Sequence, residues 1–155
     1  MIKIIFLDFD GVITTVDSKW GLDPNKLIIL EKILKKTDAK LVISSSWRRA
    51  TVEKTIEKLM DEKGHFMNNM IFPFCDRIIG VTDLIMEYGK HAIRGIEIKR
   101  WLEDNMKDKE YRYIILDDDT DMLAEQIPYF INTDGWNGLS NLDMIQAIKI
   151  LNGKI

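Results

Sequence analysis

Short apolar segments alternate along this chain with segments whose apolar residues recur at helical spacing. Several of the apolar segments have the length and the β-branched composition of buried strands. We predict strands at residues 4–7, 40–43, 77–81, 112–116 and 129–132. Because strands and helices alternate, the pattern favours a parallel sheet with helices on both faces. The sequence therefore predicts an α/β fold.

The helical segments begin and end at recognisable signals. Asp23 and Pro24 are typical of an N-cap and a first turn, and they precede a helix that we expect to reach residue 36. Gly64 is expected to close the second helix. The predicted helices after the first lie at residues 51–63, 94–106, 122–127 and 142–151. Residues 65–76 are expected to be irregular, and residues 83–92 to form a loop with a helical turn.

Composition restricts the class of protein. A chain of 155 residues with 46% hydrophobic and 30% charged residues predicts one globular domain, residues 1–155. A net charge of −3 argues against extended duplex binding but not against recognition of one phosphorylated end. Cys75 alone can form neither an internal disulfide nor a cysteine-rich zinc site. With an N-terminal apolar run too short for a signal peptide, we expect a cytoplasmic protein without membrane segments or an obligatory protein partner.

Polar residues follow three of the predicted strands directly. The first strand is followed by Asp8 and Asp10, with Phe9 between them and Gly11 after them. Ser44 follows the second strand, and an acidic run follows the fourth. Gly11 would let the chain turn at once and bring both acids around one point. Ligands of such sheets bind at the carboxyl ends of the strands, so we expect these groups to meet at one edge of the sheet.

The acids at these strand ends predict a metal site. The set is Asp8, Asp10, Asp117 and Asp118. Several carboxylates packed together cannot all stay ionised without a cation. Mg²⁺ is the expected ion, because it takes oxygen ligands and retains several waters. We favour Asp118 as the direct ligand with Asp117 as its neighbour, while Asp117 paired with Asp121 is the alternative.

The whole pattern resembles the phosphatases of the haloacid dehalogenase (HAD) superfamily. An apolar strand followed by Asp-x-Asp is similar to the first HAD motif, Ser44 to the second, and the acidic run after residue 116 to the fourth. The resemblance implies that Asp8 is a nucleophile forming an aspartyl-phosphate and that Asp10 is the general acid and base. It implies that Ser44 binds phosphoryl oxygens. It also implies a Rossmann-like three-layer sandwich; the short gaps between motifs predict no large cap domain.

The third HAD motif is a cation that balances the charge of the transferring phosphoryl group. Lys90, Arg94 and Lys99 all lie in the appropriate interval. We favour Arg94, because it stands at the predicted start of a helix, whose N-terminus would also face the phosphate.

A finer resemblance concerns the substrate. Residues 42–48, 94–102 and 115–119 are similar to the small HAD subfamily linked with RNA-repair proteins, akin to the phosphatase half of polynucleotide kinase. This implies a phosphorylated substrate such as a nucleic-acid end, although a nucleotide or another phosphomonoester stays open. The substrate contacts that we expect are Gly11, Ser45, Arg48 and Lys90.

Two other classes of protein also place acids in a parallel sheet. A receiver-like signalling domain would end its first strand in adjacent acids and carry its phosphoacceptor on the third strand, unlike this chain. A degenerate HAD domain would bind phosphate without turnover, against which the intact Asp8 and Asp10 argue. Turnover, as opposed to a single stoichiometric phosphorylation, separates an enzyme from both.

Overall fold

The computed structural model describes residues 1–61 and 68–153. In this part of the chain, five parallel strands form one sheet in the order β3-β2-β1-β6-β7. The strands are β1 (Ile2–Leu7), β2 (Lys40–Ile43), β3 (Ile78–Val81), β6 (Tyr111–Asp117) and β7 (Phe130–Asn132). The predicted α/β fold with a parallel sheet of five strands is therefore confirmed.

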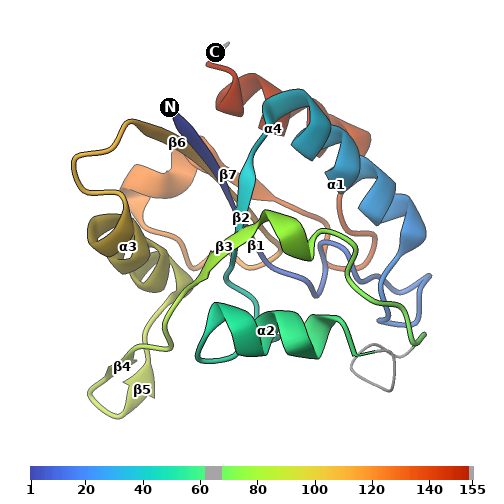
Figure 1. The fold of residues 1–155 in the computed structure, drawn as a ribbon, viewed down its shortest axis with the longest axis horizontal. Coiled ribbons are helices and arrows are strands. Elements are labelled where there is room, and N and C mark those ends of the chain that lie inside the picture. The colour runs from blue at the N-terminus through green and yellow to red at the C-terminus, as the bar shows by residue number, and fades with distance from the viewer. Residues whose placement is uncertain (62–67, 154–155) are drawn as a thin grey trace.

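Helices cover both faces of the sheet. Figure 1 shows α1 (Pro24–Thr37) and α4 (Asn141–Leu151) on one side and α3 (Arg94–Asn105) on the other. The remaining α-helix of the described residues is α2 (Val52–Leu59), which follows β2. The Asp23 side chain accepts a hydrogen bond from the backbone of Asn25 and caps α1, as its sequence position predicts. This arrangement is the predicted three-layer sandwich.

The alternating side chains of β1 divide the core into two layers. Ile5 and Leu7 are fully buried in the cluster that includes residues of α1 and α4. Ile4 and Phe6 point to the other face and pack with residues of α3. There Phe6 meets Trp101 edge-on, with ring centroids 5.6 Å apart. Because β1 is buried on both faces, it carries a continuous apolar run in place of an alternating one.

Several segments differ from the sequence prediction. Helix α2 ends at Leu59, earlier than expected, and the predicted stop at Gly64 lies outside the described residues. The segment 122–127, expected to be a short α-helix, is replaced by the 3₁₀ helix η2 (Ala124–Tyr129). Another 3₁₀ turn, η1 (Cys75–Arg77), precedes β3.

A small antiparallel hairpin replaces the loop with a helical turn expected within residues 83–92. It consists of β4 (Met86–Glu87) and β5 (Lys90–His91) and projects from the body of the protein in Figure 1. Tyr88 and Gly89 both have positive φ angles, 50° and 74°, as in a tight two-residue hairpin turn. Strands of two residues are too short to show a period in sequence. The described residues contain no large cap domain.

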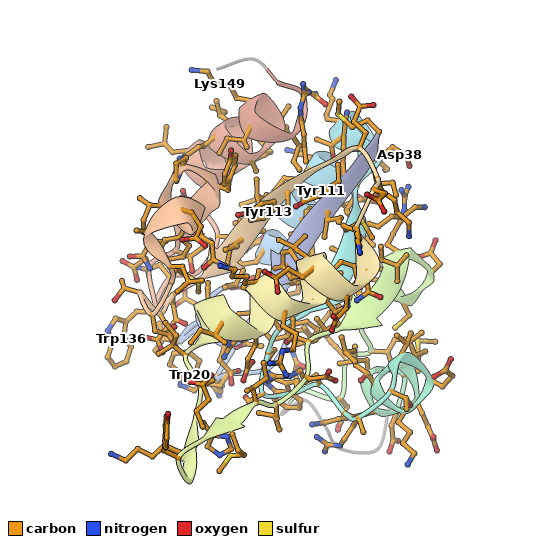
Figure 2. The ribbon with its side chains drawn as sticks, turned by 90° about the vertical axis from the view of Figure 1, so that its left-hand side faces the viewer. Trp20, Asp38, Tyr111, Tyr113, Trp136 and Lys149 are labelled. Carbon is orange, nitrogen blue, oxygen red and sulfur yellow. The ribbon has the colours of Figure 1, made fainter. Side chains whose placement is uncertain are left out.

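Two loops at the carboxyl ends of the strands are joined to each other. The backbone N–H of Val16 donates to the carbonyl of Trp136 (3.0 Å), and that of Leu139 donates to the carbonyl of Val12 (2.9 Å). Trp20 and Trp136 stand out at this end of the molecule in Figure 2, with ring centroids 6.1 Å apart. No helix in the described residues is long and apolar enough to span a bilayer.

Candidate active site

The register of the strands brings Asp8, Ser44 and Asp117 to the same edge of the sheet. Leu7 pairs with Ile43 of β2 and with Leu116 of β6, so that the residues following them begin at the same edge of the sheet. The backbone N–H of Asp8 donates to the carbonyl of Leu116 (3.0 Å), and the N–H of Ser44 donates to that of Leu7 (3.1 Å). The edge lies where the strand order reverses, between β1 and β6, the usual ligand position in such sheets.

Side-chain alternation then sets the direction of these groups. Phe6 points to the α3 face of the sheet, so Asp8 two residues later is expected to share that face. Residues 42 and 115 also pack against α3, which gives Ser44 and Asp117 the same direction. All three side chains are buried, Asp8 at 7% exposure and the other two fully.

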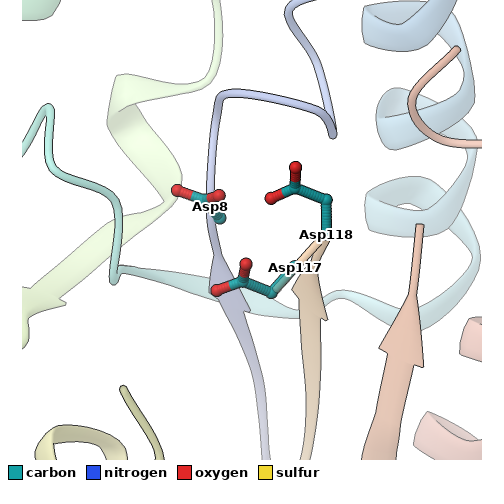
Figure 3. A group of neighbouring side chains, drawn as sticks. All are labelled: Asp8, Asp117 and Asp118. Carbon is teal, nitrogen blue, oxygen red and sulfur yellow. The ribbon is translucent and has the colours of Figure 1, made fainter. Parts of the chain in front are cut away.

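Asp118 completes an acidic cluster with Asp8 and Asp117, in which one carboxylate oxygen from each residue lies within 4.8 Å of the others. Figure 3 shows the three side chains close together at the carboxyl ends of β1 and β6. Gly11 and Gly135 make room for Asp118, since a Cβ on either would lie 2.4 Å or 3.0 Å from its Oδ2. Gly11 also has a φ of 75°, which favours glycine. These carboxylates could hold a metal ion.

Arg94 is the cation that faces the cluster. Its guanidinium lies 3.5 Å from Asp8 Oδ1 and 3.3 Å from Asp117 Oδ2, and it donates to the carbonyl of Ser44. Arg94 is the first residue of α3, and its backbone N–H donates to Asp121 Oδ2 (2.9 Å). Asp121 therefore tethers the start of this helix, while the side chain of Arg94 reaches across to β1, β2 and β6.

Burial makes the acids of the cluster weaker than ordinary carboxylic acids. It raises the pKa of Asp8 to about 6, against the opposing charge of Arg94. It raises the pKa of Asp117 to about 8, with the charge of Asp8 adding to the effect and Arg94 again opposing it. The pKa of Asp118 is also raised by burial. A divalent cation among these groups would favour their ionised forms.

Asp10 lies apart from this cluster. Its exposed carboxylate accepts hydrogen bonds from Thr14 Oγ1 (2.9 Å) and from Trp47 Nε1 (3.2 Å). Three of the four acids of the expected metal site thus lie together, whereas the Asp10 side chain is exposed to solvent. These two hydrogen bonds fix the direction of the Asp10 carboxylate.

Two serines follow β2 at the floor of the site. Ser44 Oγ is fully buried and has no hydrogen-bond partner among the described residues. Ser45 donates a side-chain hydrogen bond that lowers the pKa of Asp8, while its Oγ accepts from the backbone of Trp47 (3.1 Å). A buried hydroxyl without a partner is costly, so Ser44 is suited to bind an oxygen that enters the site with a ligand.

Comparison with known families separates a HAD domain from a receiver-like domain. A family model described as the HAD domain in Swiss Army Knife RNA repair proteins matches residues 4–144. The chain belongs to this HAD family. The strand order agrees, since receiver-like domains place the first strand between the second and third, whereas here β2 lies between β1 and β3. Comparisons of this HAD domain with curated proteins and with solved structures found no match.

Arg48 occupies a different position from the substrate contact that its motif suggested. Its Nη2 forms a buried ion pair with Glu97 Oε2 at 2.6 Å, with both side chains at 5% exposure or less. Its Nη1 donates to the carbonyls of Ser44 (2.9 Å) and Ser45 (2.8 Å). In the HAD domain Arg48 thus ties the loop after β2 to α3, because its Nη groups are committed to protein partners.

The other predicted cations lie away from the cluster. Lys90 is exposed on the β4–β5 hairpin and has no ion pair among the described residues. Lys99 points toward η2, where it pairs with Glu125 at 3.2 Å. Of the three candidates for the third HAD motif, Arg94 is the one that contacts the cluster.

Sequence reasoning missed two residues that shape the site. Glu97 pairs with Arg48, and Thr133 Oγ1 donates to the carbonyl of Gly11 (2.7 Å), which fixes the turn after β1. Thr133 follows directly after β7, the same strand-end position that identified Ser44, so a search of every strand end would have found it. No local signal marks Glu97, because an acid in the first turn of a helix is common.

Proposed function

We propose that this HAD domain is a Mg²⁺-dependent phosphomonoester hydrolase that acts through an aspartyl-phosphate on Asp8. The observation that carries the proposal is the position of the Asp8 carboxylate, which lies 3.5 Å from the guanidinium of Arg94 and within 4.8 Å of two further acids at the carboxyl edge of the sheet. With a pKa of about 6, Asp8 is mostly ionised at neutral pH and able to act as a nucleophile.

The reaction would proceed in two displacements. A carboxylate oxygen of Asp8 attacks phosphorus, the bond from phosphorus to the leaving oxygen breaks, and Asp10 donates a proton to that oxygen. Asp10 then accepts a proton from a water molecule that attacks the phosphorus of the aspartyl-phosphate, which releases inorganic phosphate and restores Asp8. Arg94 and the hydroxyl of Ser44, which has no partner among the described residues, would bind the phosphoryl oxygens.

The acidic cluster suits Mg²⁺. Asp8, Asp117 and Asp118 present only oxygen donors, and their burial makes their mutual repulsion strong unless a cation is present. Bound there, Mg²⁺ would supply positive charge beside the transferring phosphoryl group. The carboxylates of Asp117 and Asp118 would both serve the site, with Asp121 engaged instead at the start of α3.

A phosphorylated nucleic-acid end is the substrate class that we favour. The matching family is described from RNA repair proteins. No large cap domain stands over the cluster in the described residues, so a bulky substrate has access to Asp8. A phosphate-binding module without turnover remains the competing function, to be judged by experiment.

The test is steady-state release of phosphate from an aryl phosphate, with Mg²⁺ and with a chelator. Asp8→Asn should abolish turnover and remain folded, because it removes a buried acid from a repulsive cluster. Asp17→Asn, an exposed acid in the loop after β1, is the matched control and should retain wild-type activity. Turnover that persists in Asp8→Asn would refute the nucleophile. Stoichiometric phosphorylation of folded wild type without turnover would instead establish the binding module.

A further inference from the structure

A cavity of about 780 Å³ opens between the loop after β2, the segment after β3 and helix α3. Three arginines line it, and we call it the arginine cavity: Arg48, Arg49 and Arg100. Its acidic lining residue is Asp83. Arg48 is balanced by its ion pair with Glu97, and Arg49 and Arg100 outnumber Asp83, so the arginine cavity is net positive, although the chain as a whole carries a charge of −3.

The arginine cavity is connected to the reaction centre. A smaller cavity of about 330 Å³ shares Ser46, Arg48 and Leu84 with it and extends to Arg94. Arg48 and Arg94 both donate to the carbonyl of Ser44, so the two guanidinium groups lie next to each other. A ligand whose phosphate lies at Asp8 can thus continue past Arg48 into the arginine cavity.

Two residues that line the arginine cavity each have a buried polar atom without a partner in the described part of the chain. Thr82 Oγ1 and Arg48 Nε are both buried without a hydrogen bond. Thr82 is 2% exposed, and it follows directly after β3 at the same edge of the sheet as Ser44. Arg100 forms no ion pair with any described residue, and it is exposed. An exposed guanidinium without an ion pair and a hydroxyl without a partner, on the wall of a net positive cavity, favour an anionic ligand.

The remaining wall is apolar. Leu84, Ile85 and Met86 come from the segment that leads into the β4–β5 hairpin. A volume of about 780 Å³ is far larger than one phosphate requires and is in the range of cavities that hold a molecule of nucleotide size. Donors on one side and apolar side chains on the other suit a phosphodiester joined to a sugar and base.

We propose that the arginine cavity binds the nucleotide adjoining the one that carries the terminal phosphate, with the connecting phosphodiester at Arg100 and Thr82. This deepens the proposed function and rests on it, since it places the scissile phosphate at Asp8. The two acids that line the smaller cavity are engaged by other groups of the protein. Glu97 is paired with Arg48, and Asp121 accepts from the backbone of Arg94.

The test compares substrates of increasing length. The series contains an aryl phosphate, nucleoside 3′- and 5′-monophosphates, and dinucleotides with a terminal phosphate at either end. For the preferred end, we expect the dinucleotide kcat/KM to exceed that of the mononucleotide about tenfold or more, the factor given by one hydrogen bond to a charged group. If a nucleoside 3′,5′-bisphosphate shows the same increase in kcat/KM as the dinucleotide, the cavity binds only a second phosphate, and the proposal that it binds a linked nucleotide is overturned.

Two variants remove the proposed contacts without touching the reaction centre. Arg100→Gln and Thr82→Val should each reduce the dinucleotide advantage several-fold and leave aryl phosphate turnover within about twofold of wild type. Thr82→Val should fold normally, since the lost hydroxyl has no partner among the described residues. Lys149→Gln is the charge-matched control, because Lys149 is exposed on α4, at the end of the molecule away from Trp20 and Trp136 in Figure 2.

A dinucleotide advantage that is absent, or that survives in both variants, would overturn the proposal. If wild type hydrolyses none of the substrates, the proposed function fails. Binding of a labelled phosphorylated dinucleotide, measured by equilibrium dialysis, then tests separately whether the arginine cavity binds a nucleotide. Tighter binding of the dinucleotide than of the mononucleotide, lost in Arg100→Gln and kept in Lys149→Gln, would support it. Equal binding by all the proteins would refute it.

Discussion

Replacing Arg48 with methionine tests the buried ion pair that holds the loop after β2 against α3. Methionine retains much of the arginine volume but removes the partner of Glu97, whose side chain is 4% exposed, and two donors to backbone carbonyls. Leaving one member of a buried ion pair without its partner typically costs about 3–5 kcal/mol. We expect Arg48→Met to lower the free energy of unfolding by an amount in this range.

The loss should depend on pH in a definite direction. Burial already raises the pKa of Glu97 above its ordinary value of 4.5, despite the opposing charge of Arg48. Without Arg48 that pKa rises further, so the folded variant holds the proton more tightly than the unfolded chain does. Stability of the variant relative to wild type should therefore fall as pH rises above 4.5, and the destabilisation should be smaller at acidic than at neutral pH.

Urea denaturation followed by circular dichroism, without Mg²⁺, measures both effects. Arg77→Met is the matched control, because Arg77 pairs with Asp38 at the same 2.6 Å but Asp38 is 85% exposed. An exposed pair is worth less than about 1 kcal/mol. Adding Glu97→Met to Arg48→Met should recover part of the loss. An Arg48→Met destabilisation no larger than that of Arg77→Met, or one independent of pH, would refute the reasoning.

Three further predictions concern the site itself. Gly11→Ala should reduce turnover at least about 100-fold by displacing a carboxylate of the cluster; Gly89→Ala, with a similar φ of 74° and open space around it, should strain the chain equally but leave turnover unchanged. Arg94→Gln should lower kcat about 10²–10³-fold, and Lys99→Gln, whose lysine is paired elsewhere, should retain wild-type kcat. Because Asp117 has a pKa raised from 3.8 to about 8, the metal-free protein should lose stability as pH rises through that interval. Mg²⁺ should restore part of the lost stability near pH 8. Thermal unfolding of wild type and of Asp117→Asn across this pH range would check the prediction, because the dependence of stability on pH should be weaker in the variant.

Much of the fold follows from local patterns in the sequence. The apolar run before Asp8 and the similar run before Ser44 are strands, because residues buried on both faces of a sheet leave a continuous apolar signature. The cap at Asp23 marks the start of α1 correctly. The hairpin around Gly89 was not predictable, since two residues cannot show a period.

The sequence also determined which residues stand at the carboxyl ends of the strands, and hence that Asp8, Ser44 and Asp117 share one edge of the sheet. Only the tertiary structure decided which cation reaches that edge. Arg94 and Lys99 lie on one helix, and the helix start only favoured Arg94; the position of α3 against the sheet directs Arg94 to the cluster and Lys99 to η2. The tertiary structure also decided that Arg48 pairs with Glu97. Periodicity and propensity are properties of neighbouring residues, whereas these pairings depend on how elements distant in sequence pack together.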